Sequence, residues 1–297
     1  MHNNSWSLVF FTLLSQACAG IMIFLAATFF IDQQTFQAIP NGFSFLSPDF
    51  LAFLMMAVAV LFSFLHLGKP LHAVSAMNHL SSSWLSREIF AVLIFGISVL
   101  SVFLLRIFEP SQEWLIPVSL IFSAISGVFL VAIISKVYLI KTIPPWNSWH
   151  TPTSFFLSAL ILGAVATVLL FLSSIGILKT GFITPTYILG LSWALVIFLS
   201  IETITTLIFH AKRLQKSPAG IERISFNTGK YHTLHLIRIF ILFVALFFTL
   251  YFIFRLPVIS DNFQAHIRFF AMIFSLIVIE EIIGRSQFYA SYYRVGV

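Results

Sequence analysis

Repeated long apolar runs constrain this chain more than any other feature of its sequence. A helix of about 20 apolar residues is long enough to cross the ~30 Å hydrocarbon core of a bilayer. Eight such runs cover roughly residues 7–31, 49–67, 87–107, 114–140, 152–177, 183–210, 233–254 and 264–283. The sequence therefore predicts an all-α polytopic membrane protein, a bundle of eight transmembrane helices in a single integral-membrane domain over residues 1–297. Eight spans place both termini on the same side of the membrane.

The composition excludes a soluble protein with a large core. The chain is 59% hydrophobic and only 9% charged, whereas soluble domains carry about 25% charged residues. The first apolar run lacks a basic segment before it and a small-residue cleavage site, so we expect a retained helix rather than a signal peptide. No connection between the runs is long enough for a separate soluble domain. Phosphate-loop, HExxH and G-x-S-x-G motifs of soluble enzymes are also absent.

The basic residues are unevenly divided between the two expected membrane faces. We call the face that carries both termini the near side. Twelve of the sixteen lysines and arginines fall there, at Lys69, Arg87, Lys136, Lys141, Lys212, Arg213, Lys216, Arg223, Lys230, Arg238, Arg285 and Arg294. The positive-inside rule then predicts a cytoplasmic near side. A docking surface for a soluble partner is a compatible interpretation. Because these charges border apolar runs, we expect a lipid bilayer and a protein partner rather than nucleic acid.

The cysteine and histidine pattern argues against a metal cofactor in this chain. The single cysteine, Cys18, cannot hold an iron–sulfur cluster, which typically takes four. Of the nine histidines only His266 falls on the far side, so the two-depth ligand pattern of a di-haem cytochrome is missing. The sequence therefore predicts no haem, no cluster and no metal site. A single near-side haem, for example between His66 and His210, is the alternative that this pattern leaves open.

His66 and Glu88 are the most suggestive pair of titratable residues. His66 closes the second apolar run and Glu88 opens the third, so both lie at near-side helix ends. Polar groups at membrane depth are costly and point to function by default. A histidine can hydrogen-bond a quinol hydroxyl, and a partly buried carboxylate can accept its proton. The structural alternatives are an interfacial histidine and a carboxylate that complements the helix dipole, paired with Arg87 and preceded by a serine N-cap.

Other polar residues are secondary candidates. Arg87 joins His66 and Glu88 in the predicted quinol-binding group, and Tyr138 and Trp149 are candidates for contacts with the quinol ring. These two aromatic residues also fit an interfacial belt. Glu202, well inside the sixth run, is expected to form an interhelical hydrogen bond, with a proton path as the alternative. The role of Glu280 stays open, and Glu281 is expected to pair with Arg285 four residues later.

Several segments resemble the membrane-anchor subunit of the dimethyl sulfoxide reductase family, the DmsC-type anchor. They occur in order along the whole chain. The matching segments are Phe11-Thr12 through Gly20, His66-Leu67-Gly68-Lys69-Pro70, Ser86-Arg87-Glu88-Ile89, Trp149-His150-Thr151-Pro152, and Glu281-Ile282-Ile283-Gly284-Arg285 with Phe288-Tyr289.

The resemblance implies a haem-free subunit of an anaerobic respiratory complex in the bacterial inner (plasma) membrane. It implies that menaquinol is oxidised here and that its electrons pass to an iron–sulfur subunit and then to a molybdopterin catalytic subunit. The quinol-site His and Glu of the family correspond to His66 and Glu88. Catalytic subunits of the family commonly carry twin-arginine export signals, which implies a docking side outside the cytoplasm, in conflict with the charge count. The compartment, the quinone species and the terminal acceptor therefore stay open.

Two alternatives remain at this stage. A quinol-oxidising anchor of a related polysulfide- or nitrite-reductase-type complex would carry out the same reaction with a different partner. A secondary transporter should show interrupted helices near the midplane and related halves, and neither is evident in the sequence. Co-purification with iron–sulfur and molybdenum subunits would separate an anchor from a transporter.

Overall fold

The computed structural model describes residues 5–66, 80–109, 111–178, 185–215, 230–255 and 263–292. Over these residues the chain is helical, with no strand. The helices are α1 (Ser5–Ile31), α2 (Gln33–Ala38), α3 (Pro48–His66), α5 (Trp84–Phe108), α6 (Leu115–Val137), α7 (His150–Leu178), α8 (Pro185–Gln215), α10 (Lys230–Arg255) and α11 (Phe263–Ala290). Helices are the expected solution, because lipid offers no hydrogen-bond partner to an open backbone.

Seven of the described helices are long and apolar enough to cross a membrane: α1, α3, α5, α6, α7, α8 and α10. Their bounds agree with the predicted apolar runs to within a few residues. The helix α11 is just as long, with 28 residues. It falls outside this group because its sequence includes Arg268, Glu280, Glu281 and Arg285. The all-helical fold is thus confirmed over the described residues, and length and composition support seven of the eight predicted membrane spans.

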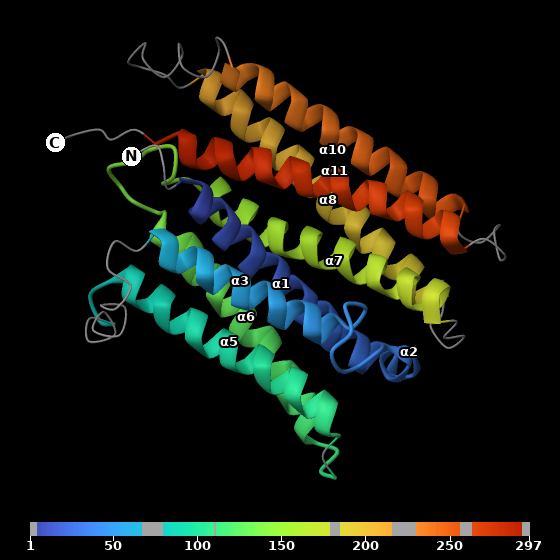
Figure 1. Cartoon of the computed structure of the whole chain (residues 1–297). Helices are drawn as coiled ribbons and strands as arrows, with labels where there is room; N and C mark the ends of the chain where they lie inside the picture. Colours follow the sequence, from blue (N-terminus) through green and yellow to red (C-terminus); the bar gives the residue numbers. More distant parts are fainter. Residues whose placement is uncertain are drawn as a thin grey trace.

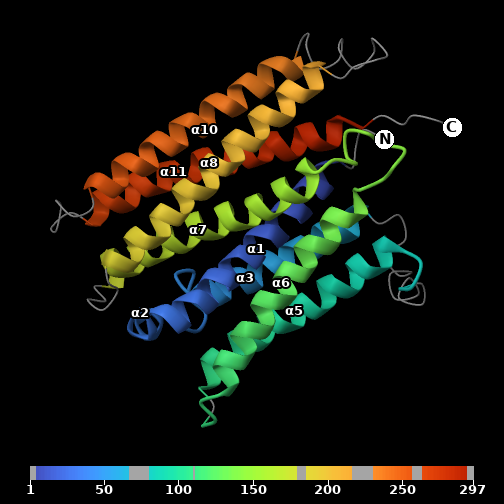
Figure 2. The same ribbon diagram turned by 180° about the vertical axis from the view of Figure 1, so that it is seen from behind.

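The helices α1 and α7 lie at the centre of the bundle. Figures 1 and 2 show α3, α5 and α6 on one side of this central pair and α8, α10 and α11 on the other. The central helices cross at two glycines: a Cβ on Gly20 would lie 1.9 Å from the Ala159 carbonyl oxygen, and one on Gly163 would lie 2.3 Å from the Gly20 carbonyl carbon. Small residues of this kind let membrane helices approach closely without a hydrophobic driving force.

The two ends of the bundle differ in what they contain. We call near end the one at which α3 ends and α5 begins (Figure 1). The helix α1 begins and α11 ends there as well, since the Tyr289 hydroxyl lies 3.4 Å from the Thr12 hydroxyl. At the opposite, far end Arg106 pairs with Asp49 at 3.1 Å, and both side chains are buried. Arg106 also donates to the carbonyl of Ile39 at 3.1 Å, which holds the α2–α3 connection to α5.

Candidate functional site

Glu88 is buried in the second turn of α5 at the near end. The helix starts there because the Ser83 hydroxyl accepts a hydrogen bond from the Ser86 N–H, as an N-cap does. The Glu88 side chain is only 7% exposed, so it does not sit at the solvated helix terminus that a simple dipole-complementing role requires. Its carboxyl group interacts electrostatically with the hydroxyls of Tyr138 and Tyr289. The candidate proton acceptor therefore faces the interior of the bundle.

His66 closes α3 at the same end, as expected. Its side chain, like the residues 67–79 that follow, lies outside the part of the chain that the structure describes. The predicted pairing of His66 with Glu88 therefore stays a prediction. The end of α3 and the beginning of α5 lie at the same end of the bundle (Figure 1), and the two helices pack against each other.

Arg87 turns away from Glu88 and binds the segment before its own helix. Its guanidinium donates to the carbonyl of Leu80 at 2.8 Å and to that of Ser81 at 2.7 Å. It also lies over the Trp84 ring at 4.3 Å. In this arrangement Arg87 anchors the backbone that leads into α5, and a quinol-binding role for it stays a prediction.

Tyr138 lies in an intramolecular aromatic cluster rather than in a lipid-facing belt. Its ring contacts Trp146, Phe155, Phe288 and Tyr289 with centroids 5.4–5.6 Å apart. The Tyr289 hydroxyl lies 3.0 Å from the Tyr138 hydroxyl. Burial, followed by the nearby Tyr289 and Glu88, raises the pKa of Tyr138 well above its ordinary value. The phenol thus keeps its proton and stays able to donate as well as accept a hydrogen bond.

Trp149 is placed differently from Tyr138. Its side chain is 44% exposed and meets the ring of His150 edge-on at 5.9 Å. The imidazole of His150 in turn stacks on Phe209 of α8 at 4.2 Å. Trp149 therefore fits the predicted interfacial position, and its contact with a quinol ring stays a prediction.

Glu202 forms the interhelical bond expected of it, with Arg238 of α10. The Arg238 guanidinium donates to Glu202 at 2.6 Å and to Glu280 of α11 at 2.5 Å, and all three side chains are buried. Gly284 makes this possible, because a Cβ there would lie 2.6 Å from the guanidinium carbon. The prediction that Arg238 adds to the basic surface of the near side was therefore wrong, because it is a buried counter-ion.

Glu281 and Arg285 do not form the expected direct ion pair. Both bind the hydroxyl of Ser158 on α7 instead, which donates to Glu281 at 2.7 Å and accepts from Arg285 at 3.1 Å. Arg285 also donates to Gln16 of α1 at 2.8 Å and lies over the Phe155 ring at 3.8 Å. The pairing fails because both side chains turn towards polar groups on neighbouring helices instead of along their own helix surface.

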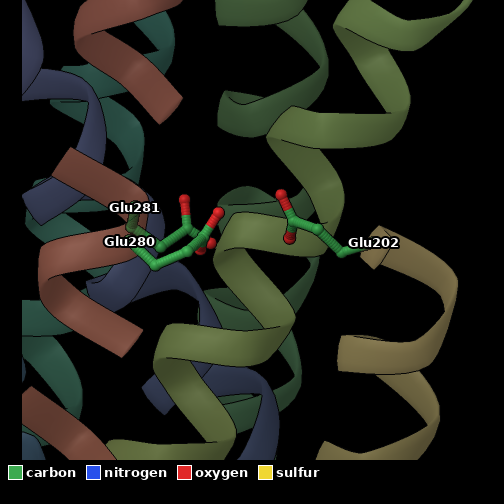
Figure 3. A group of neighbouring side chains, drawn as sticks. All are labelled: Glu202, Glu280 and Glu281. Atoms are coloured by element: carbon green, nitrogen blue, oxygen red, sulfur yellow. The ribbon is translucent and has the colours of Figure 1, made fainter. Parts of the chain in front are cut away.

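Glu202, Glu280 and Glu281 converge on one another inside the bundle, as Figure 3 shows. One carboxyl oxygen of each lies within 4.8 Å of the others, a spacing that could hold a metal ion. The guanidinium of Arg238 already binds two of the three carboxylates, however. These carboxylates are therefore suited to the guanidinium that they already bind, and a metal ion would have to displace it.

A cavity of about 80 Å³, partly open to the surface, lies at the near end between α7, α8, α10 and α11. Its wall includes Thr206, Arg238 and Gln287, together with three histidines, and neither Glu88 nor Tyr138 lines it. The imidazoles of His210 and His235 stack with centroids 3.9 Å apart. Sequence reasoning missed this cavity. Its signal is the spacing of Glu202, Thr206 and His210, which places three polar side chains on one face of α8.

The chain is similar over nearly its whole length to a known protein family. The family model described as DMSO reductase anchor subunit (DmsC) matches residues 1–291. The anaerobic dimethyl sulfoxide reductase chain YnfH of Escherichia coli K12 is 27% identical over 296 residues, covering 99% of this chain and 97% of that protein. A second anaerobic dimethyl sulfoxide reductase chain of the same organism is 26% identical over 299 residues, with 99% and 97% covered. Its counterpart in Haemophilus influenzae is 28% identical over 156 residues, covering 52% and 54%. The chain therefore belongs to the family of DMSO reductase anchor subunits.

Proposed function

We propose that this chain oxidises menaquinol at its near end and passes the two electrons to an iron–sulfur subunit, which delivers them to a molybdopterin catalytic subunit. Membership of the anchor family supports a multi-pass membrane subunit with electron-transfer and catalytic partners. The names of the relatives favour a dimethyl sulfoxide reductase-type complex over the polysulfide or nitrite type. The catalytic subunit selects the terminal acceptor.

The buried carboxyl group of Glu88 carries the proposal. Three other buried carboxylates, Asp49, Glu202 and Glu280, each form an ion pair with an arginine. Among the described side chains no ion pair neutralises Glu88. A buried acid at membrane depth without such a partner is a functional-site candidate. Oxidation of menaquinol to menaquinone releases two protons and two electrons, and Glu88 is placed to accept one proton while His66 holds the other hydroxyl.

We further infer that α11 is the eighth span, although its composition is less apolar. Three of its four charged residues, Glu280, Glu281 and Arg285, are buried against the rest of the bundle. Inward-facing ionisable groups that bind one another are the usual form of charge inside a membrane. Eight spans put both termini on the near side, in the bacterial plasma membrane. The basic residues of the near side other than the buried Arg238 and Arg285 then dock the iron–sulfur subunit, close enough for electrons to leave the quinol. Loop residues 216–229 lie outside the described part of the chain.

The test compares two electron donors in membranes that contain equal amounts of the assembled complex. For Glu88→Gln and His66→Ala we expect the ratio of quinol-driven to dye-driven turnover to fall by ~10²-fold, the scale of lost general-base catalysis. Dye-driven turnover should be unchanged, because the dye feeds the soluble subunits directly. Glu113→Gln, an exposed carboxylate between α5 and α6, is the control. A ratio equal to that of the unmodified complex in both variants would refute the proposed site.

A further inference from the structure

Three helices of the second half of the bundle each direct a row of polar side chains towards the near-end cavity. On α8 the row is Glu202, Thr206 and His210, spaced four residues apart. On α10 it is His235 and Arg238, and on α11 it runs from Glu280 and Glu281 past Gly284 to Gln287. The outer members of these rows line the cavity, and the inner members form the buried carboxylate cluster.

Thr206 joins the carboxylate cluster to the cavity. Its side chain is only 2% exposed and lies one turn beyond Glu202 on α8. Thr206 lines the cavity wall, and its hydroxyl oxygen has no hydrogen-bond partner in the described part of the chain. One oxygen of each clustered carboxyl, Glu202, Glu280 and Glu281, is likewise without a partner there. A buried hydroxyl and three half-bonded carboxyls are groups that can accept and release a proton.

The same cluster extends towards Glu88 through a second set of contacts. Glu281 binds the Ser158 hydroxyl, which contacts Arg285, and Arg285 binds Gln16. Gln16 lies one turn from Thr12 on α1. The Thr12 hydroxyl meets that of Tyr289, which in turn lies 3.0 Å from that of Tyr138. Both phenols are within electrostatic range of Glu88, so polar side chains line the interior between Glu88 and the second half of the bundle.

The charges of the cluster do not cancel. Three carboxyl groups, Glu202, Glu280 and Glu281, share the space with two guanidiniums, Arg238 and Arg285. Full ionisation would leave one uncompensated negative charge in a low-dielectric interior, which is costly. One bound proton removes that charge. A proton shared among carboxyls within 4.8 Å of one another can be replaced from one side and released on the other.

We propose that this polar path carries the protons of quinol oxidation from Glu88 to water in the near-end cavity. The inference rests on the proposed function. Each menaquinol gives two electrons to the iron–sulfur subunit and two protons to Glu88 and its neighbours. Glu281 accepts a proton, passes it to Glu280 or Glu202 and is then ready for the next, and the cavity receives the proton past Thr206. Arg238 and Arg285 keep their protons and hold the carboxyls in place.

Glu281→Gln tests the path in the complete complex in native membranes. The amide keeps the shape of the side chain but cannot take up and pass on a proton. With a menaquinol analogue as donor we expect the first turnover, followed by reduction of the iron–sulfur clusters, to keep its normal rate, because Glu88 and His66 can hold the first two protons. Steady-state quinol-driven turnover should fall by ~10²-fold, with dye-driven turnover unchanged. Glu281→Asp should restore most of the rate, which a purely structural role would not require.

Thr206→Val is a milder variant that removes one hydroxyl at nearly constant volume. We expect steady-state quinol-driven turnover to fall about two- to tenfold, the scale of the one hydrogen bond that the hydroxyl can offer to a proton in transit, again with a normal first turnover. Thr203→Val on the same helix is the control, because its hydroxyl bonds the Leu199 carbonyl within its own helix at 2.7 Å. If the Glu281→Gln complex fails to assemble, Thr206→Val alone tests the proton path.

Three outcomes separate the path from the quinol site. Normal steady-state turnover in Thr206→Val, or in an assembled Glu281→Gln complex, would overturn the path and leave the proposed quinol site intact. If the first turnover of Glu281→Gln or Thr206→Val slowed as much as its steady-state turnover, the path would also be overturned. The cavity would then bind quinol itself instead of receiving its protons. A normal first turnover in Glu88→Gln would instead refute the proposed function.

Discussion

The bundle contains two buried groups of charged side chains, and these groups differ in their ratio of carboxyl groups to guanidinium groups. At the far end one carboxylate, Asp49, faces one guanidinium, Arg106, and both bind the backbone or side chains of the connection beside them. In the near half three carboxyls face two guanidiniums. In a matched pair the two charges neutralise each other without a bound proton, so the pair fixes helices to one another and does not exchange protons. An unmatched cluster must hold a proton, so it is suited to transferring one.

Arg238→Leu should produce the largest effect on stability. It leaves Glu202 and Glu280 without their cation, whereas Arg106→Leu leaves only one carboxylate unpaired. Breaking a buried pair costs about 3–5 kcal/mol, so we expect Arg238→Leu to reach or exceed that range and to lower the amount of complex in the membrane. Thermal unfolding of the detergent-solubilised complex measures both variants. Equal or greater loss in Arg106→Leu would mean that the two groups of charges do not differ in the way described.

The same chemical change, carboxyl to amide, should have opposite consequences in the two groups. Asp49→Asn removes the buried carboxylate partner of Arg106, and we expect a loss of ~3 kcal/mol, at the lower end of the range because Glu109 still interacts with that guanidinium. Glu281→Gln leaves two carboxyls and two guanidiniums, so we expect a change of less than ~1 kcal/mol. Chemical denaturation of the solubilised complex can compare them. A loss in Glu281→Gln as large as that in Asp49→Asn would contradict the charge imbalance.

The sequence predicts the helices well because length and apolarity decide them almost alone. It also indicates Glu88, since an acid next to an apolar run is visible without a structure. Arg238 and Arg285 are harder to interpret: near a predicted helix end, a buried arginine and an interfacial one have the same local sequence. Only the packing of α8, α10 and α11 shows that Arg238 bridges two carboxylates on different helices.

Some of the site depends on contacts that no local pattern encodes. Tyr138 has the composition of a belt residue, yet it meets Tyr289, which is 151 positions away in sequence. Glu281 and Arg285 have the spacing of a helical ion pair, yet each prefers Ser158 of another helix. The cavity is equally non-local, because it is formed by residues from four helices and the segment that precedes α7. Long-range partners of this kind follow from helix packing and require the tertiary structure.

The location of bound quinone tests the central proposal most directly. A photoreactive menaquinone analogue, activated in membranes that contain the complete complex, can be mapped onto the chain by mass spectrometry of its peptides. We expect adducts at the near ends of α3 and α5, within about the first two turns of α5 around Glu88, and we expect excess unlabelled menaquinone to prevent them. Adducts confined to the wall of the second-half cavity, such as residues 206–210 of α8, would contradict the proposal and place quinol oxidation among its histidines.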